Sequence, residues 1–96
     1  MDDLKWIQEW YRARLNSEWE EYYGIKIDTL DNPGWIVMID VAETEYENKV
    51  FNPYILNNGE NDWIDCKIEN GCFIGAGDSS KLLEIVALFR KWIESV

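Results

Sequence analysis

The stretch IDTLDNPGWIVMID, residues 27–40, carries the alternation that decides the fold. Before the pair Pro33-Gly34, apolar residues at 25 and 27 alternate with polar ones. After it the alternate positions are again apolar: Trp35, Val37, Ile39 and Val41. A period of two is typical of strands with one buried face. The stretch therefore predicts a β-hairpin in which Pro33 and Gly34 form the central pair of a type II turn.

The two apolar rows of this hairpin constrain its connection. They share one face only if the loop has an odd number of residues or contains a bulge, which we expect at Gly34. Ile36, Met38 and Asp40 then lie on the opposite face. Asp31 in the turn and Asp40 at the strand end place carboxylates at the two ends of the second strand.

The residues before the hairpin have helical spacing. Residues 2–15, DDLKWIQEWYRARL, repeat aromatic and aliphatic side chains every three or four positions, which predicts a helix with a wide aromatic face. Ser17 to Glu20 fits a capping box, and Gly24 can end the segment that follows. We expect there a short helix or a kinked continuation of the first helix.

The residues after the hairpin predict a second sheet segment. Residues 43–49 are polar and acidic and predict a loop, and Pro53 in VFNPYILN, residues 50–57, indicates an edge strand or a break. Asn70-Gly71 is a strong signal for a two-residue hairpin. This turn pairs Cys66 with Gly75 and places Cys66 and Cys72 on opposite faces of the sheet, so we expect no disulfide.

The last segment, DSSKLLEIVALFRKWIESV at 78–96, predicts an amphipathic helix capped by Asp78, Ser79 or Ser80. The order of elements predicts an α+β fold: an antiparallel sheet of about five short strands with an N-terminal and a C-terminal helix packed on it. A chain of 96 residues is expected to form a single domain, residues 1–96.

Charge narrows the classes of partner. Nineteen acids against nine bases give a net charge of −10, which disfavours nucleic acid and anionic membrane surfaces and favours a basic protein. The chain begins MDDLKW, unlike a signal peptide, and contains no apolar run of about 20 residues. Together with two unpaired cysteines, these features predict a cytoplasmic protein.

Little in the sequence indicates catalysis. The chain contains no histidine, so the usual general base and the commonest metal ligand are missing. Residues 75–80, GAGDSS, are able to cradle an anion, and Cys72 is a candidate sulfur carrier. A glycine-rich entry into a helix and a half-buried strand cysteine explain both features better. We expect no catalytic residues, no cofactor and no metal.

The acids concentrate in one part of the chain. Residues 40–69 hold eight acids and two bases, a net charge of −6, together with Tyr46, Tyr54 and Trp63. Acids beside aromatic rings on an outward face suit the binding of a cationic protein. A solvated sheet face with Trp63 covered by a neighbouring element is the alternative. The candidate binding residues are Asp31, Asp40, Glu43, Glu45, Glu47, Asp62, Trp63 and Asp65.

With these segments in place, the chain resembles the immunity protein 53 family of bacterial polymorphic toxin systems. The most specific matching string is IDTLDNPGW, followed by an apolar strand that reaches Asp40. The other matching residues are Trp6, Trp10, Tyr11, Trp19, Tyr23, Gly24, NDW at 61–63, Cys66, Gly75, Gly77, Leu83, Glu84, Ile85 and Trp92.

The resemblance implies a cytoplasmic, non-catalytic antidote that binds and blocks a cognate toxin. If the toxin is a nuclease, its basic cleft suits an acidic inhibitor. Two alternatives remain open: a general interaction module, including a homodimer with exposed rings at its interface, and, less favoured, a small anion-binding or sulfurtransferase-like enzyme.

Overall fold

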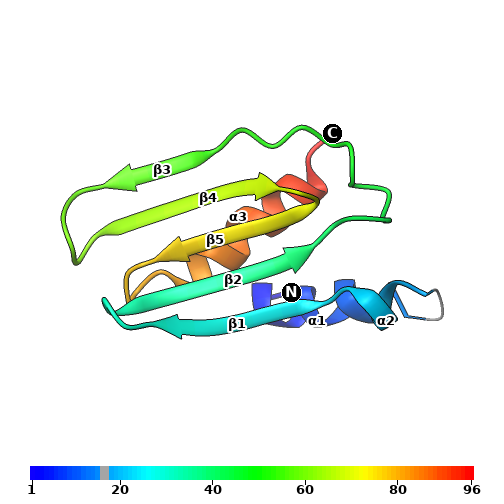
Figure 1. Cartoon of the computed structure of the whole chain (residues 1–96), viewed down its shortest axis with the longest axis horizontal. Helices are drawn as coiled ribbons and strands as arrows, with labels where there is room; N and C mark the ends of the chain where they lie inside the picture. The colour runs from blue at the N-terminus through cyan, green and yellow to red at the C-terminus, as the bar shows by residue number, and fades with distance from the viewer. Residues whose placement is uncertain (16–17) are drawn as a thin grey trace.

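A computed structural model describes residues 1–15 and 18–96 and shows two layers, a five-stranded antiparallel sheet and the two long helices behind it (Figure 1). The strands follow the order β1-β2-β5-β4-β3. The elements are α1 Asp3–Arg12, α2 Trp19–Tyr22, β1 Ile25–Leu30, β2 Gly34–Asp40, β3 Tyr54–Asn57, β4 Trp63–Glu69, β5 Cys72–Gly77 and α3 Leu82–Glu94. The predicted α+β fold is confirmed.

The first hairpin has the predicted parity but a different turn. Ile27 pairs with Val37, and a loop of three residues, 31–33, joins β1 to β2, so both apolar rows lie on one face. The predicted type II turn is wrong, because Gly34 lacks the positive φ such a turn needs and is already paired with Leu30 in the sheet. The Asn32–Pro33 peptide bond is cis.

Gly34 is required for packing rather than for a turn or a bulge. A Cβ on Gly34 would overlap the carbonyl oxygen of Gly77 on β5, and the Trp63 ring lies 3.5 Å from the same position. Only a residue without a side chain allows this close approach.

The second hairpin agrees with the prediction. Asn70 and Gly71 have φ values of 52° and 74°, as a type I′ turn requires, and Cys66 pairs with Gly75. The two cysteines are free; Cys66 is buried beneath the helices and Cys72 is half-buried on the other face.

Aromatic rings fill the core between the sheet and the helices. Phe89 on α3 is fully buried, with its ring centroid 5.2 Å from that of Trp10 on α1 and 5.1 Å from that of Phe73 on β5. Aromatic pairs at this separation stabilise a core by more than the burial of their apolar area alone. The Trp92 indole donates a hydrogen bond of 2.9 Å to the Val50 carbonyl, which fixes the long loop before β3.

The helix ends refine the predicted boundaries. Asp2 caps α1 by accepting a hydrogen bond from the Lys5 amide, and α1 ends at Arg12 instead of residue 15. The predicted capping box begins at Ser17, which lies outside the described residues. The expected caps of α3 are wrong, because its N-cap is Lys81, without a side-chain cap, while Asp78 binds the amides of Ser80 and Trp63.

Candidate functional site

Within the described residues, neither long helix packs against one face of the sheet. α1 and α3 both lie behind the sheet in Figure 1, and the strand registers show which side chains point the other way. We call this side the open face. It comprises Lys26, Asp28 and Leu30 of β1, Gly34, Ile36, Met38 and Asp40 of β2, Cys72, Ile74 and Ala76 of β5, Trp63, Asp65, Lys67 and Glu69 of β4, and Ile55 and Asn57 of β3.

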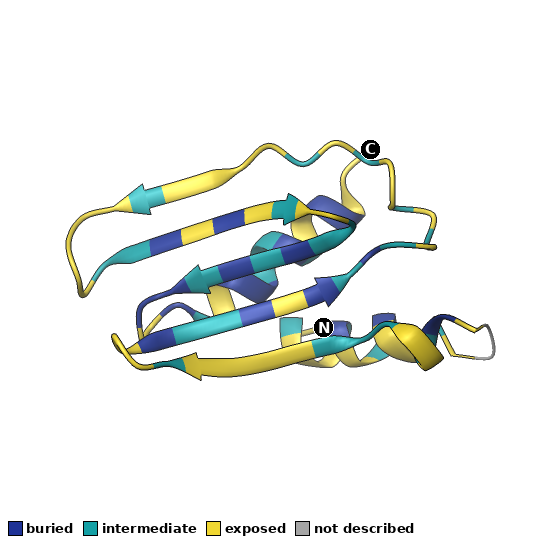
Figure 2. Cartoon of the chain, in the orientation of Figure 1, coloured by how far each residue is buried: buried dark blue, intermediate teal, exposed yellow. Residues whose placement is uncertain are grey.

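The open face has an apolar centre and a charged border. Met38 pairs with Ile74, and Ile36 pairs with Ala76, so the two central strands present aliphatic side chains side by side. The strands that flank them contribute mostly charged residues to this face. Figure 2 shows the alternation of buried and exposed positions along β4, and the mostly exposed outer strands β1 and β3. Met38 remains 37% exposed.

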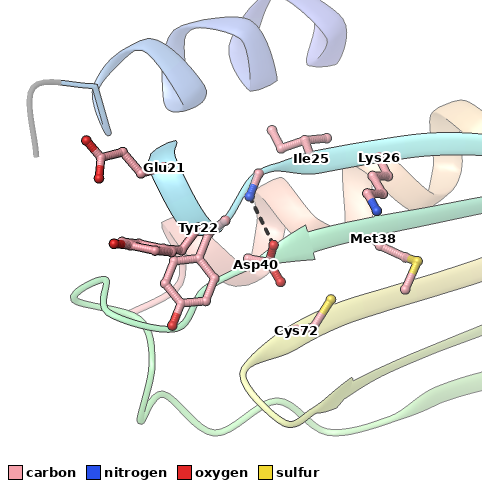
Figure 3. Close-up of a pocket in the computed structure, with 9 residues that line it drawn as sticks. Glu21, Tyr22, Ile25, Lys26, Met38, Asp40 and Cys72 are labelled. Carbon is pink, nitrogen blue, oxygen red and sulfur yellow. Dashed lines mark hydrogen bonds between the residues drawn. The ribbon is translucent and has the colours of Figure 1, made fainter. Parts of the chain in front are cut away.

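A pocket of 380 Å³ lies at the end of the open face next to α2; we call it the end pocket. Its lining combines residues of α2, of the segment that leads into β1, and of the ends of β2 and β5: Glu21, Tyr22, Tyr23, Gly24, Ile25, Lys26, Met38, Asp40 and Cys72. In Figure 3, Met38, Asp40 and Cys72 project from neighbouring strands and Tyr22 lies beside Asp40. A hydrogen bond of 3.0 Å from the Gly24 amide holds the Asp40 carboxylate.

The end pocket has a negative electrostatic environment. The pKa of the Tyr23 phenol is raised, first by the charge of Glu43 and also by those of Glu47 and Asp40. Within the described residues, no lysine or arginine lies within 4.0 Å of these three carboxylates. Neighbouring carboxylates that have no basic partner attract a cationic group.

The structure therefore brings part of the predicted binding set together. Asp40, Glu43 and Glu47 act on the same tyrosine at the α2 end of the sheet. Glu45 belongs to the same loop but pairs with Arg14 at 3.4 Å. Because the Arg14 guanidinium also lies 4.5 Å from the Trp10 ring centroid, Glu45 helps attach the loop to α1.

The remaining predicted residues do not join this group. Asp31 and Asp62 lie in turns at the opposite end of the sheet, and Asp65 lies between the two ends on β4 (Figure 1). Asp62 forms an ion pair of 2.8 Å with Lys81, which lowers the pKa of the Asp62 carboxyl. Trp63 is half-buried, and its ring lies against Gly34 of β2. A Trp63 ring covered by a neighbouring element is the predicted alternative to a binding role.

The glycine-rich segment is used for packing. A Cβ on Gly75 would overlap Cγ2 of Ile85 on α3, and one on Gly77 would lie 2.7 Å from Cβ of Lys81. Two of the amides that follow already have acceptors, since Asp78 N–H donates to the Trp63 carbonyl and Ser80 N–H to the Asp78 carboxylate. These glycines let α3 approach the sheet, which accounts for the GAGDSS stretch without an anion.

The environment of Cys72 does not activate a thiol. Burial, followed by the negative charge of Asp40, raises the pKa of Cys72 to about 11, so the thiol is protonated at neutral pH. The described residues contain no cluster of three or more side chains able to hold a metal ion. No helix among them is long and apolar enough to cross a membrane.

Sequence reasoning did not assign Glu21, Tyr22 or Tyr23 to the site. Tyr22 and Tyr23 follow a helical spacing, which favours a core position, yet Tyr22 is 73% exposed. The local signal is Gly24, which follows the C-cap of α2 and donates its amide hydrogen bond to Asp40 on β2. Their meeting with Asp40 depends on the hydrogen bond between Gly24 and Asp40, sixteen residues apart.

The fold is an α+β sandwich of one sheet and two long helices, and its open face has an apolar centre bordered by charge, a feature of many protein-binding surfaces. The family model described as immunity protein 53 matches residues 4–94, nearly the whole chain. The chain belongs to the immunity protein 53 family. No curated protein and no solved structure matches it.

Proposed function

We propose that this protein is a cytoplasmic, non-catalytic antidote that binds a cognate toxin and neutralises it. The observation that carries the proposal is membership of the immunity protein 53 family across residues 4–94. The net charge of −10 and the three carboxylates that act on the Tyr23 phenol support a basic partner. The predicted set Asp31, Asp40, Glu43, Glu45, Glu47, Asp62, Trp63 and Asp65 remains the proposed source of binding residues.

The positions of these residues indicate which of their charges are available to a toxin. Asp40, Glu43 and Glu47 lie together and have no basic partner within the described residues, so their charges are available to a toxin. Glu45 and Asp62 each form an ion pair within the protein, with Arg14 and Lys81. We therefore expect the first three acids to contribute more to binding than Glu45 and Asp62.

A nuclease is the toxin class that this charge distribution fits best. A nuclease cleft is basic because it binds phosphates, and an acidic protein is able to occupy it. Association should then be fast at low salt and slow as the ionic strength rises.

Co-expression tests the proposed function. The toxin gene adjacent to the gene for this protein is induced in a sensitive bacterial host, with and without this protein. Survival only in its presence, and a complex that persists through gel filtration, are the expected results. Equal killing in both strains and the absence of a complex would refute the proposal for that toxin.

A further inference from the structure

The open face and the end pocket form one continuous surface. Met38 and Cys72 belong both to the apolar centre of the face and to the lining of the pocket. Met38 lies directly beside Ile74, so an aliphatic surface leads from the middle of the sheet into the pocket. A single segment of a partner can therefore contact both without a bend in its path.

The chemistry of the end pocket suits a cationic side chain. Asp40 is fixed by the Gly24 amide, so its charge is already positioned before a partner arrives. The two tyrosine rings beside it offer π faces, which attract Lys and particularly Arg. Among the described residues, Lys26 is the one basic residue in the lining; it belongs to β1 and pairs with Met38.

A second apolar surface lies on the helix side of the sheet and is the other candidate for contact with a partner. It is a groove of 550 Å³ between α1 and the start of β1, lined by Leu4, Ile7, Gln8, Tyr11, Gly24 and Ile25. None of the described residues in its lining carries a carboxylate. A basic partner gains no electrostatic attraction from that lining, so charge complementarity favours the open face.

We propose that the open face is the toxin-contact surface, that the toxin inserts a lysine or arginine into the end pocket, and that it packs an adjacent apolar side chain over Met38 and Ile74. This proposal rests on the proposed function and specifies the surface and the partner chemistry. An apolar anchor in the centre with charge at the border is the usual arrangement of protein-binding hot spots.

Binding measurements with the catalytically inactivated toxin domain encoded by the adjacent gene test the contact surface. Met38→Lys and Ile74→Lys should each weaken binding at least about 30-fold, because each places a charge in the apolar centre. Leu83→Lys on α3 is the matched control, since Leu83 is also an exposed aliphatic residue, with 63% exposure, and lies on the helix side. It should change the dissociation constant less than about three-fold.

Two charge variants test the sign of the partner group. Asp40→Asn keeps an oxygen that can accept the Gly24 hydrogen bond but removes the charge, so binding should weaken and depend less on salt. Lys26→Gln should instead strengthen binding, because it removes a like charge from the pocket lining. The opposite pair of signs would mean that the pocket receives an anionic group and would overturn the proposal.

The possible results separate this inference from the proposed function. If the wild-type protein neither binds nor neutralises the toxin, both proposals fail. If it binds and Leu4→Lys in the helix-side groove abolishes binding while Met38→Lys does not, the function stands and the contact surface is wrong. If sedimentation shows a dimer that Met38→Lys dissociates while toxin binding is unchanged, the open face belongs to a second copy of the chain. Circular dichroism and thermal unfolding of each variant identify any loss of binding caused by misfolding.

Discussion

Replacement of Gly75 by alanine tests whether the glycine-rich segment exists for packing. Gly75 lies in the middle of β5, paired with Val37 on one side and Cys66 on the other. An added Cβ would overlap Cγ2 of the fully buried Ile85 and would lie 3.2 Å from a Phe73 ring carbon and 3.3 Å from the Cys66 sulfur. α3 or the neighbouring side chains must therefore move.

The expected free-energy change combines two opposing effects. Overpacking of a filled core costs about 1–3 kcal/mol. Alanine recovers about 0.5–1 kcal/mol, because it loses less backbone freedom on folding than glycine. We expect Gly75→Ala to lower the free energy of unfolding by about 1–2 kcal/mol, a large part of the roughly 5–14 kcal/mol typical of a protein of this size.

Urea unfolding followed by tryptophan fluorescence measures this change as a shift of the midpoint at a constant slope. Gly24→Ala is the matched control, because nothing lies within 4 Å of the added Cβ at Gly24. Ile85→Ala supplies a second background, in which the vacated space accepts the methyl group and Gly75→Ala should cost nothing. An equal cost in both backgrounds, or no cost in the wild-type background, would refute the packing explanation.

Three further predictions concern other parts of the structure. Hydrogen bonds from the Ser80 hydroxyl, and then from the Lys81 ammonium, hold the pKa of Asp78 well below its ordinary value of 3.8. The ionised Asp78 carboxylate therefore stabilises the fold fully at pH values above 3.8, and this stabilisation is lost as the pH falls below 3.8. Acid unfolding curves should show that loss in the wild type and much less of it in Asp78→Asn. Cys72 should react with iodoacetamide much more slowly at pH 7 than glutathione does, and its rate should rise toward pH 11. A mass-spectrometric time course measures the labelling, and fast labelling at pH 7 would contradict a protonated thiol. Phe89→Ala should lower the free energy of unfolding by about 3–5 kcal/mol in chemical denaturation, whereas Leu83→Ala, at an exposed position of the same helix, should stay within about 0.5 kcal/mol.

The secondary structure and the strand faces could be predicted because they depend on local patterns. The period of two around Val37 and Ile39 placed both on the buried face, and the Asn70-Gly71 turn fixed the pairing of Cys66 with Gly75. The loop parity followed from the same alternation. The turn at Pro33 was predicted wrongly, because a Pro-Gly pair suits a type II turn and nothing local reveals that Gly34 must pack against Gly77.

The candidate site could be predicted only in part. Asp40 and the acidic loop after it are evident from charge, but their partners Tyr22 and Tyr23 come from a segment that precedes β1. The ion pair of Asp62 with Lys81 joins a turn to the start of a distant helix, and that of Glu45 with Arg14 joins a loop to the segment after α1. Long-range pairs of this kind depend on how the layers pack, so sequence proximity does not indicate which acids remain available.

The amino-acid sequence by itself determined the number and type of the elements, the net charge of −10 and the resemblance to the immunity protein 53 family, because each is a local or additive property of the chain. Only the tertiary structure decided that both long helices cover the same side of the sheet and leave Met38 and Ile74 on an uncovered face. The choice of face arises from packing: Phe89 and the other large rings fill the side where Gly75 lets α3 approach closely. Among the described residues, no long helix therefore packs against the opposite side, where Met38 and Ile74 lie.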